Sequence, residues 1–445
     1  MTVMHRLVLM LGLAAVGLGA TGAAAGVATE TPAKTIAIVP FSLPTGTTER
    51  EWLSEGLPRV LALRLQPLSH VNVAVLPRLS ASVSDTLPHP TEGTQIATLL
   101  EHLRSQGYDL VVVGTFHQTE PELRAEVHLW LTQPERHLGK TLNQSSDKDP
   151  DALGAKIATF LASALQPTLS ELEGRRVGER YTTSAEAFER FARALAVADT
   201  ASAEEDVNRA VNLFREAISL DGKFVMALRQ LGDLHFNKGQ YGRAAETYQT
   251  YLNQGRRSAA VYRLLGHAYF AQHDVSRAIE AYRRGLQLDA RDPHLHVDLG
   301  LAYTASKDYE NATKALLRAL EVKPDDPLAF ANLGVVYLLQ GNLPAATSSL
   351  RRAQVLQGSN AMLAYNLGLS LMLEGAYDLA REQLERALEL QPGYAAAAYQ
   401  LALLTERVEP DRAIDHWRRY AELAAERPDE EAWLAYAQSR LARRQ

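Results

Sequence analysis

Residues 292–325, DPHLHVDLGLAYTASKDYENATKALLRALEVKPD, form one copy of a unit that recurs every 34 residues in the second half of the chain. The unit is marked by a Leu-Gly dipeptide, which stands at Leu231-Gly232, Leu265-Gly266, Leu299-Gly300, Leu333-Gly334 and Leu367-Gly368, with Leu401-Ala402 as a sixth member. A fixed period of this length indicates stacked helical hairpins, because one hairpin cannot bury its apolar side alone. Such stacks present long concave surfaces, so the spacing favours binding over catalysis.

Other positions of the unit repeat in phase with the dipeptide. An alanine follows the glycine by twelve residues in all five units, at Ala244, Ala278, Ala312, Ala346 and Ala380. Small residues let the two helices of a hairpin approach closely, while larger residues fill the remaining gaps. Asp292-Pro293 and Asp326-Pro327 predict an N-cap followed by a proline in the first helical turn.

This pattern resembles the tetratricopeptide repeat (TPR) over residues 185–428, followed by a capping helix over 429–445. The resemblance implies an all-α solenoid, a right-handed superhelix of about six or seven helical hairpins. The earliest unit is degenerate: Phe188 and Phe191 fit its first helix and Phe214 its second, but residues 199–206 depart from the period.

The first 28 residues have the pattern of a secretory signal peptide. Arg6 precedes an uncharged run, Leu7 to Ala25, that ends in small residues. An uncleaved membrane anchor is the alternative, because the run nearly reaches spanning length. We therefore expect a periplasmic or secreted protein with no membrane span after cleavage. The chain contains no cysteine, which excludes disulfides and thiolate sites.

Residues 34–167 alternate between strand and helix patterns. Strands are predicted at 35–41, 71–76, 109–116 and 123–131, and helices at about 49–66, 95–106 and 150–165. This order predicts an α/β domain. Its segments Ile36-Ala37-Ile38-Val39-Pro40-Phe41, Glu55-Gly56-Leu57 and Tyr108-Asp109-Leu110-Val111-Val112-Val113-Gly114 are similar to the N-terminal domain of TolB-type and FlgO-type bacterial envelope proteins. That resemblance implies a non-catalytic envelope or assembly domain.

No motif of the sequence predicts catalysis, a cofactor or a metal. Gly17-x-Gly19-x-x-Gly22 matches a dinucleotide fingerprint only in letters, since it lies in the predicted signal peptide. Gly139-Lys140-Thr141 resembles the end of a phosphate-binding loop, but Pro134 stands where that loop needs its first glycine. His294 and His296 are two residues apart on a helix and point in different directions. The net charge of −6 is dispersed, so nucleic acid is not an expected partner.

The residue before each Leu-Gly leucine is the first candidate for partner binding. In TPR proteins that bind extended chains, asparagines at this place hold the ligand's backbone amides. Asn332 and Asn366 match that use, while Gln230, Asp298 and Gln400 are looser substitutes. The alternative is that these side chains face water or tie adjacent helices together.

Neighbouring groove positions become apolar towards the C-terminus. The predicted strip consists of Leu328, Val335, Leu338, Met362, Tyr365, Leu369, Met372 and Tyr399. Methionine and tyrosine suit adaptable contacts, so we expect an apolar partner segment to bind there. The alternative is internal: the strip packs against the N-terminal domain or another copy of the chain.

Together these patterns predict a non-enzymatic, periplasmic interaction scaffold whose TPR groove binds a protein or peptide in cell-envelope assembly or trafficking. The alternative hypothesis is a regulatory or sensor subunit whose N-terminal domain binds a small ligand.

Overall fold

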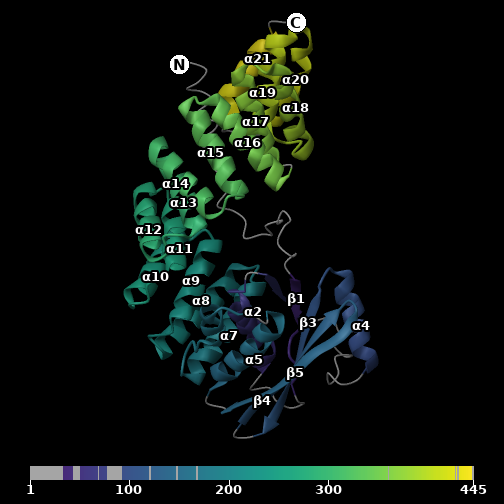
Figure 1. Cartoon of the computed structure of the whole chain (residues 1–445), viewed down its shortest axis with the longest axis vertical. Coiled ribbons are helices and arrows are strands. Elements are labelled where there is room, and N and C mark those ends of the chain that lie inside the picture. Colours follow the sequence, from purple (N-terminus) through teal and green to yellow (C-terminus); the bar gives the residue numbers. More distant parts are fainter. Residues whose placement is uncertain are drawn as a thin grey trace. The chain divides into compact units, whose positions relative to one another are not determined.

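A computed structural model describes most of the chain after the predicted signal peptide, which lies outside the described residues. The described ranges are 34–43, 51–68, 70–77, 93–119, 122–146, 149–166, 169–358, 360–425, 427 and 430–442. They form two compact units that meet in sequence between Arg256 and Arg257. These are called the N-terminal unit and the C-terminal unit below (Figure 1).

The N-terminal unit begins with a five-stranded sheet. Its strands are β1 (Lys34–Ile38), β2 (Val71–Val75), β3 (Leu110–Thr119), β4 (Glu122–Thr132) and β5 (Glu135–Ser146). Their order is β2-β1-β3-β4-β5; β1 is parallel to both its neighbours, and β3, β4 and β5 form an antiparallel meander. The sequence predicted the first four strands and missed β5, whose residues are mostly polar because it is an edge strand.

Helices cover both faces of this sheet, which confirms the α/β prediction (Figure 1). Helix α4 (Gly93–Ser105) packs on the face that carries Ala37 and Val111. Helices α2 (Glu51–Leu65) and α5 (Pro150–Leu165) pack on the opposite face, which carries Ile36 and Ile38. Alternate residues of β1 therefore belong to two separate cores, as the period of two in a strand requires.

Five further helices complete the N-terminal unit. They are α6 (Glu171–Gly178), α7 (Ala185–Thr200), α8 (Glu204–Leu220), α9 (Val225–Asn237) and α10 (Tyr241–Asn253). The hydrophobic core beneath α2 continues into these helices: the ring of Trp52 lies 6.1 Å from that of Phe188. A Cβ on Gly56 would lie 2.8 Å from the Cβ of Ala192, so α2 and α7 are in close contact. The sequence boundary between 167 and 185 is thus not a boundary in packing.

A buried ion pair reinforces that junction. The guanidinium of Arg64, on α2, donates to the Asp151 carboxylate at the start of α5 and to the carbonyl oxygens of Val177 and Glu179. Asp151 also accepts the backbone N–H of Tyr181 at 2.6 Å. Both side chains are almost fully buried, so each depends on the other for its compensating charge.

The C-terminal unit is a run of paired helices. They are α11 (Ala259–Ala271), α12 (Val275–Leu288), α13 (Pro293–Ala305), α14 (Tyr309–Val322), α15 (Pro327–Gln340), α16 (Leu343–Gln357), α17 (Ala361–Glu374), α18 (Tyr377–Leu390), α19 (Ala395–Val408), the short η2 (Pro410–Arg412), α20 (Ala413–Ala424) and α21 (Glu431–Ala442).

The sequence signals of these hairpins act as predicted. Asp292 accepts the backbone N–H of Leu295, and Asp326 accepts that of Ala329, so both cap their helices. A Cβ on Gly300 would lie 2.6 Å from Cγ of Leu316, which explains why the dipeptide needs glycine. The first helix of each hairpin can therefore lie directly against the second.

Candidate binding sites

The polar residues that precede the leucine of each Leu-Gly or Leu-Ala dipeptide are buried in some repeats and partly accessible in others. Asn332, Asn366 and Gln400, on α15, α17 and α19, are buried, whereas Gln230 on α9 and Asp298 on α13 are partly accessible. The Oδ1 atom of Asn366 has no hydrogen-bond partner among the described residues. The three buried amides thus lie within the helix packing, and their use in binding a partner's backbone stays a prediction.

Asp298 belongs to a small charged cluster on α11 and α13. Nε2 of His267 lies 2.8 Å from Oδ2 of Asp298, and Nε of Arg263 lies 3.8 Å from the same oxygen. All three side chains remain partly accessible. This end of the C-terminal unit therefore presents hydrogen-bonding groups of both charges.

The predicted apolar strip is only half accessible, which corrects the expectation of a continuous exposed surface. Leu338, Tyr365, Leu369 and Tyr399 are buried, with Tyr365 1% and Leu369 0% exposed. Those that keep accessible surface are Leu328, Val335, Met362 and Met372.

The burial of Tyr399 has a visible cause. Its ring centroid lies 5.5 Å from that of Trp417 and 5.1 Å from that of Tyr420, both on α20, and 5.2 Å from that of Trp433 on α21. Edge-to-face packing of this kind stabilises an aromatic core. The last helices of the same unit thus cover Tyr399, whereas packing of the strip against the N-terminal domain or another copy of the chain stays an untested alternative.

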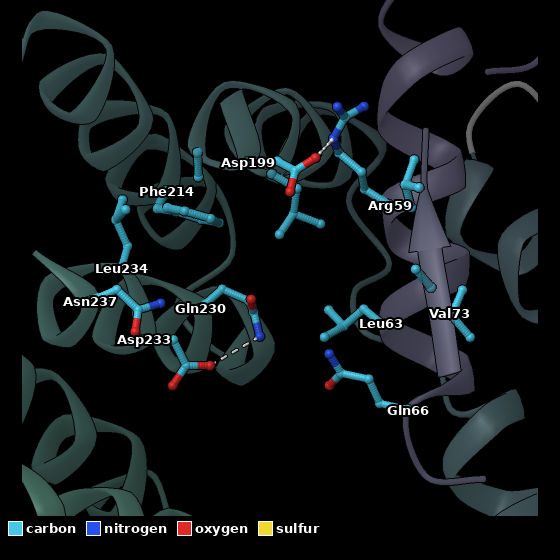
Figure 2. Close-up of a pocket in the computed structure, with 14 residues that line it drawn as sticks. Arg59, Leu63, Gln66, Val73, Asp199, Phe214, Gln230, Asp233, Leu234 and Asn237 are labelled. Carbon is cyan, nitrogen blue, oxygen red and sulfur yellow. Dashed lines mark hydrogen bonds and ion pairs between the residues drawn. The ribbon is translucent and has the colours of Figure 1, made fainter. Parts of the chain in front are cut away.

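A pocket of about 410 Å³ lies within the N-terminal unit, between α2 and β2 on one side and α7, α8 and α9 on the other (Figure 2). Its polar lining consists of Arg59, Gln66, Asp199, Gln230, Asp233 and Asn237. Its apolar lining consists of Ala62, Leu63, Val73, Val75, Leu195, Ala198, Phe214 and Leu234. From the sequence, Gln230 and Asp233 are polar groove positions of an early repeat. The sequence does not predict the pocket, because its lining comes from segments that no motif links and only the fold brings together.

The two carboxylates of this pocket have different hydrogen-bond partners: Asp199 is bonded to an arginine, and Asp233 to neutral groups. Nε of Arg59 donates to Asp199 at 3.1 Å, and its Nη1 donates to the carbonyl oxygen of Glu55 at 2.8 Å. Asp233 accepts from the Tyr248 hydroxyl at 2.7 Å and from Nε2 of Gln230 at 3.4 Å. Burial raises the pKa of Asp233, and the opposing effects of Arg229 and the Tyr248 hydrogen bond do not cancel it.

Histidine side chains with polar neighbours occur on the sheet and at the start of α13. On the sheet, Nδ1 of His128 lies 3.0 Å from Nε2 of His137, and Nε2 of His128 lies 3.1 Å from the Glu126 carboxylate. His296 contacts the carbonyl oxygen of Ala290 at 2.9 Å. In the part of the chain that the structure describes, no three His, Asp or Glu side chains are arranged to hold a metal ion. Nor does any described helix have the length and apolarity needed to cross a bilayer.

Comparison with protein families identifies the repeats. A family model described as TPR repeat matches residues 266–305 and 300–341, and two tetratricopeptide repeat models match residues 201–268 and 346–395. The paired helices over these ranges are therefore tetratricopeptide repeats, preceded by a mixed α/β region. The matched ranges begin at residue 201, so the TolB-type or FlgO-type identity of the α/β region stays a prediction.

Several solved structures are similar to part of this chain. PilF of Pseudomonas aeruginosa is 22% identical, with 48% of this chain and 97% of that chain covered and a TM-score of 0.42. A tetratricopeptide repeat protein from Parabacteroides merdae is 14% identical, with 57% and 99% covered and a TM-score of 0.48. MamA from Desulfovibrio magneticus is 20% identical, with 38% and 97% covered and a TM-score of 0.36. No curated protein matches the chain.

Proposed function

We propose that this protein is a non-catalytic interaction scaffold whose tetratricopeptide repeats bind a polypeptide partner. The proposal is carried by the side chains that stay accessible on consecutive first helices, among which Leu328 and Met362 occupy the same position of the repeat. Leu328 and Val335 lie on α15, and Met362 and Met372 lie on α17. Methionine adapts its shape to different apolar surfaces, which suits a docking site better than a rigid core.

The first hairpins and the middle hairpins of the C-terminal unit offer different chemistry to such a partner. The cluster of Arg263, His267 and Asp298 can form charged hydrogen bonds, whereas the α15 and α17 side chains can bury apolar groups. An amphipathic segment fits this division, with polar residues near α11 and α13 and apolar residues near α15 and α17. The alternative occupant of the same surface is a second copy of this chain.

Site-specific photocrosslinking tests this assignment in cells that produce the protein. A benzoylphenylalanine residue at position 328 or 362 should give a discrete crosslinked product. The matched control is position 355, because Val355 is 73% exposed but lies on α16, the second helix of its hairpin. Mass spectrometry of the product then separates a foreign polypeptide from a second copy of this chain.

Charge substitutions provide the complementary measurement. Met362→Glu places a carboxylate on the apolar part of the surface and should remove most of the crosslinked product formed at position 328. Val355→Glu should leave that product unchanged. Equal crosslinking at positions 328, 362 and 355, or an unaltered yield in Met362→Glu, would contradict the groove assignment.

We also propose that the protein acts in the periplasm, in cell-envelope assembly or trafficking. This part rests on the signal-like pattern of residues 1–28 and on the resemblance of residues 34–167 to envelope proteins. Intact-mass measurement of the protein from fractionated cells tests it. Cleavage after Ala25 or Ala28 with recovery in the periplasmic fraction is expected, whereas an uncut N-terminus in the membrane fraction would indicate an anchor.

The pocket of the N-terminal unit favours a second candidate, a regulatory or sensor subunit. Its walls come from α2 and β2 of the α/β region and from the repeat helices α7, α8 and α9. A small ligand bound there would contact both parts at once and could therefore alter their packing. Ligand-dependent stabilisation of the full chain, with no effect on the crosslink at position 328, would separate this role from the scaffold role.

A further inference from the structure

The accessible charge of the pocket is acidic, although its lining contains an arginine. The Asp199 side chain is 55% exposed, whereas that of Arg59 is 7% exposed. Arg59 is also occupied by its bonds to Asp199 and to the carbonyl oxygen of Glu55. A ligand entering the pocket therefore meets carboxylate oxygens rather than a free guanidinium (Figure 2).

The Asp233 carboxylate accepts no hydrogen bond from a positively charged group among the described residues. Its hydrogen bonds come from neutral donors, the Tyr248 hydroxyl and the Gln230 amide. Nε of Arg229 lies 3.8 Å from Oδ2 of Asp233, which makes an ion pair on the same helix but no hydrogen bond. Burial raises the pKa of Asp233 more than Arg229 and the Tyr248 hydrogen bond lower it, so in the described part of the chain no hydrogen-bonded cation offsets the burial of this carboxylate.

The apolar walls stand next to these carboxylates. Leu63 on α2 and Val73 on β2 face the Asp233 side of the pocket from the α/β region, and Leu234 lies on the same helix as Asp233 (Figure 2). Gln66 is exposed beside them and has no hydrogen bond to another described residue. The pocket thus combines an acidic group, free amide groups and aliphatic surface within one small volume.

We propose that this pocket binds an ammonium or guanidinium group carried on an apolar stem. This is the chemistry of a lysine or arginine side chain and of a free aliphatic amine. The cation lies against the Asp233 carboxylate and the Gln66 amide oxygen, and the stem packs on Leu63 and Leu234. The site lies in the N-terminal unit and does not depend on the groove proposed for the C-terminal unit.

Binding of small probes to the full chain tests the charge requirement. The probes are Nα-acetyl-lysine methylamide, its uncharged counterpart Nα-acetyl-norleucine methylamide, n-hexylamine and hexanoate, and saturation-transfer NMR gives their Kd values. The lysine probe should bind about tenfold more tightly than the norleucine probe, and hexanoate more weakly still. Raising the salt concentration should reduce that difference.

The two amines identify the source of the cation. Binding of the lysine probe at least as tightly as n-hexylamine supports a side chain of a polypeptide. Binding of n-hexylamine with exclusion of the lysine probe supports a free amine. Norleucine or hexanoate binding as tightly as the lysine probe overturns the proposal.

Variants locate the binding to this pocket. Asp233→Asn keeps the size of the side chain and should weaken the lysine probe about tenfold, whereas Asp298→Asn in the C-terminal unit should leave it unchanged. Gln66 is exposed, so its substitution should not affect folding: Gln66→Lys should weaken and Gln66→Glu should strengthen binding, each about threefold. An unchanged Kd in both Asp233→Asn and Gln66→Lys overturns the site.

Discussion

The first and the last hairpins of this protein share one repeat pattern but use their interior surfaces differently. In the N-terminal unit, the first repeat helices pack on α2 of the α/β region and leave a polar pocket beside α9. In the C-terminal unit, the corresponding surface near α19 is filled by aromatic rings around Tyr399. The repeat thus sets the helix frame, while the residues between its fixed positions decide whether a surface is open or closed.

The same contrast appears at the invariant glycines. In the earlier hairpins an aromatic ring lies over the glycine: a Cβ on Gly266 would meet Cε1 of Tyr282 at 2.3 Å. In the later ones a leucine takes that place, and a Cβ on Gly368 would meet Cγ of Leu384 at 3.0 Å. A rigid tyrosine ring and a flexible leucine side chain therefore pack on the glycine in the same place. We expect them to differ in how well they accommodate a methyl group added at that glycine.

The largest expected effect concerns the core shared by the α/β region and the first repeats. Phe191 is fully buried among Tyr181, Phe214 and Phe224, so Phe191→Ala should destabilise the N-terminal unit by about 3–5 kcal/mol. Hydrogen-exchange mass spectrometry should show loss of protection in β1 and in α7 together. Leu350→Ala, at an equally buried site, should affect only helices of the C-terminal unit. Unchanged protection of β1 in Phe191→Ala would mean that the two cores are separate.

The second prediction compares the two kinds of glycine. Gly266→Ala should destabilise the protein by roughly 1–3 kcal/mol, because the Tyr282 ring cannot yield to the new methyl group. Gly368→Ala should cost less, since Leu384 can shift by a few tenths of an ångström and alanine favours helix by about 1 kcal/mol. Some cost remains, because the new methyl group would also lie 3.2 Å from the carbonyl oxygen of Ala380. Urea unfolding of both variants measures the difference. Equal destabilisation would show that the ring and the leucine are equally unyielding.

The third prediction concerns the buried tyrosine hydroxyls. Tyr248→Phe removes the 2.7 Å hydrogen bond to Asp233 and should lower the free energy of unfolding by about 1 kcal/mol. Tyr282→Phe is the control, because the Tyr282 hydroxyl has no hydrogen-bond partner within the described residues. Thermal unfolding should therefore separate the two variants, and a larger loss in Tyr282→Phe would refute this assignment.

The smallest expected effect is a dependence on pH at Asp233. Burial raises its pKa in the folded protein, so the folded state favours the protonated carboxyl. The wild type and Asp233→Asn can be compared by their free energies of unfolding. The contribution of Asp233 to this free energy is fully present below its pKa in the unfolded chain, about 3.9. It declines as the pH rises through the higher pKa of Asp233 in the folded protein. The difference in unfolding free energy between the wild type and Asp233→Asn should accordingly be more favourable to the wild type at pH 4 than at pH 7. A difference that grows with pH would reverse the sign and disprove the shift.

Sequence patterns predicted the parts of the fold that depend on local chemistry. The 34-residue period, the Asp292 and Asp326 caps and the first four strands are properties of short segments, and the structure confirms them. The irregular stretch at 199–206 has a simple cause: α7 and α8 have 16 and 17 residues, longer than the 13 residues of α9. Strand β5 was missed because an edge strand can be polar on both faces.

The candidate sites were harder to predict because they depend on tertiary contacts. Arg59 and Asp233 line one pocket although no repeat or motif relates them. The burial of Tyr365 and Leu369 was also not visible in the pattern, since a groove position and a covered position have the same apolar residues. The accessibility of a side chain depends on which other helices pack against it. The period of the repeat contains no information about those contacts.

The four tryptophans are distributed so that each compact unit has its own pair. Trp52 and Trp130 lie beside Phe188 and His137 in the N-terminal unit, whereas Trp417 and Trp433 surround Tyr399 in the C-terminal unit. Replacing one pair by phenylalanine confines tryptophan fluorescence to the other unit. Thermal unfolding of each unit can then be followed separately from the wavelength of tryptophan emission, without attaching a dye.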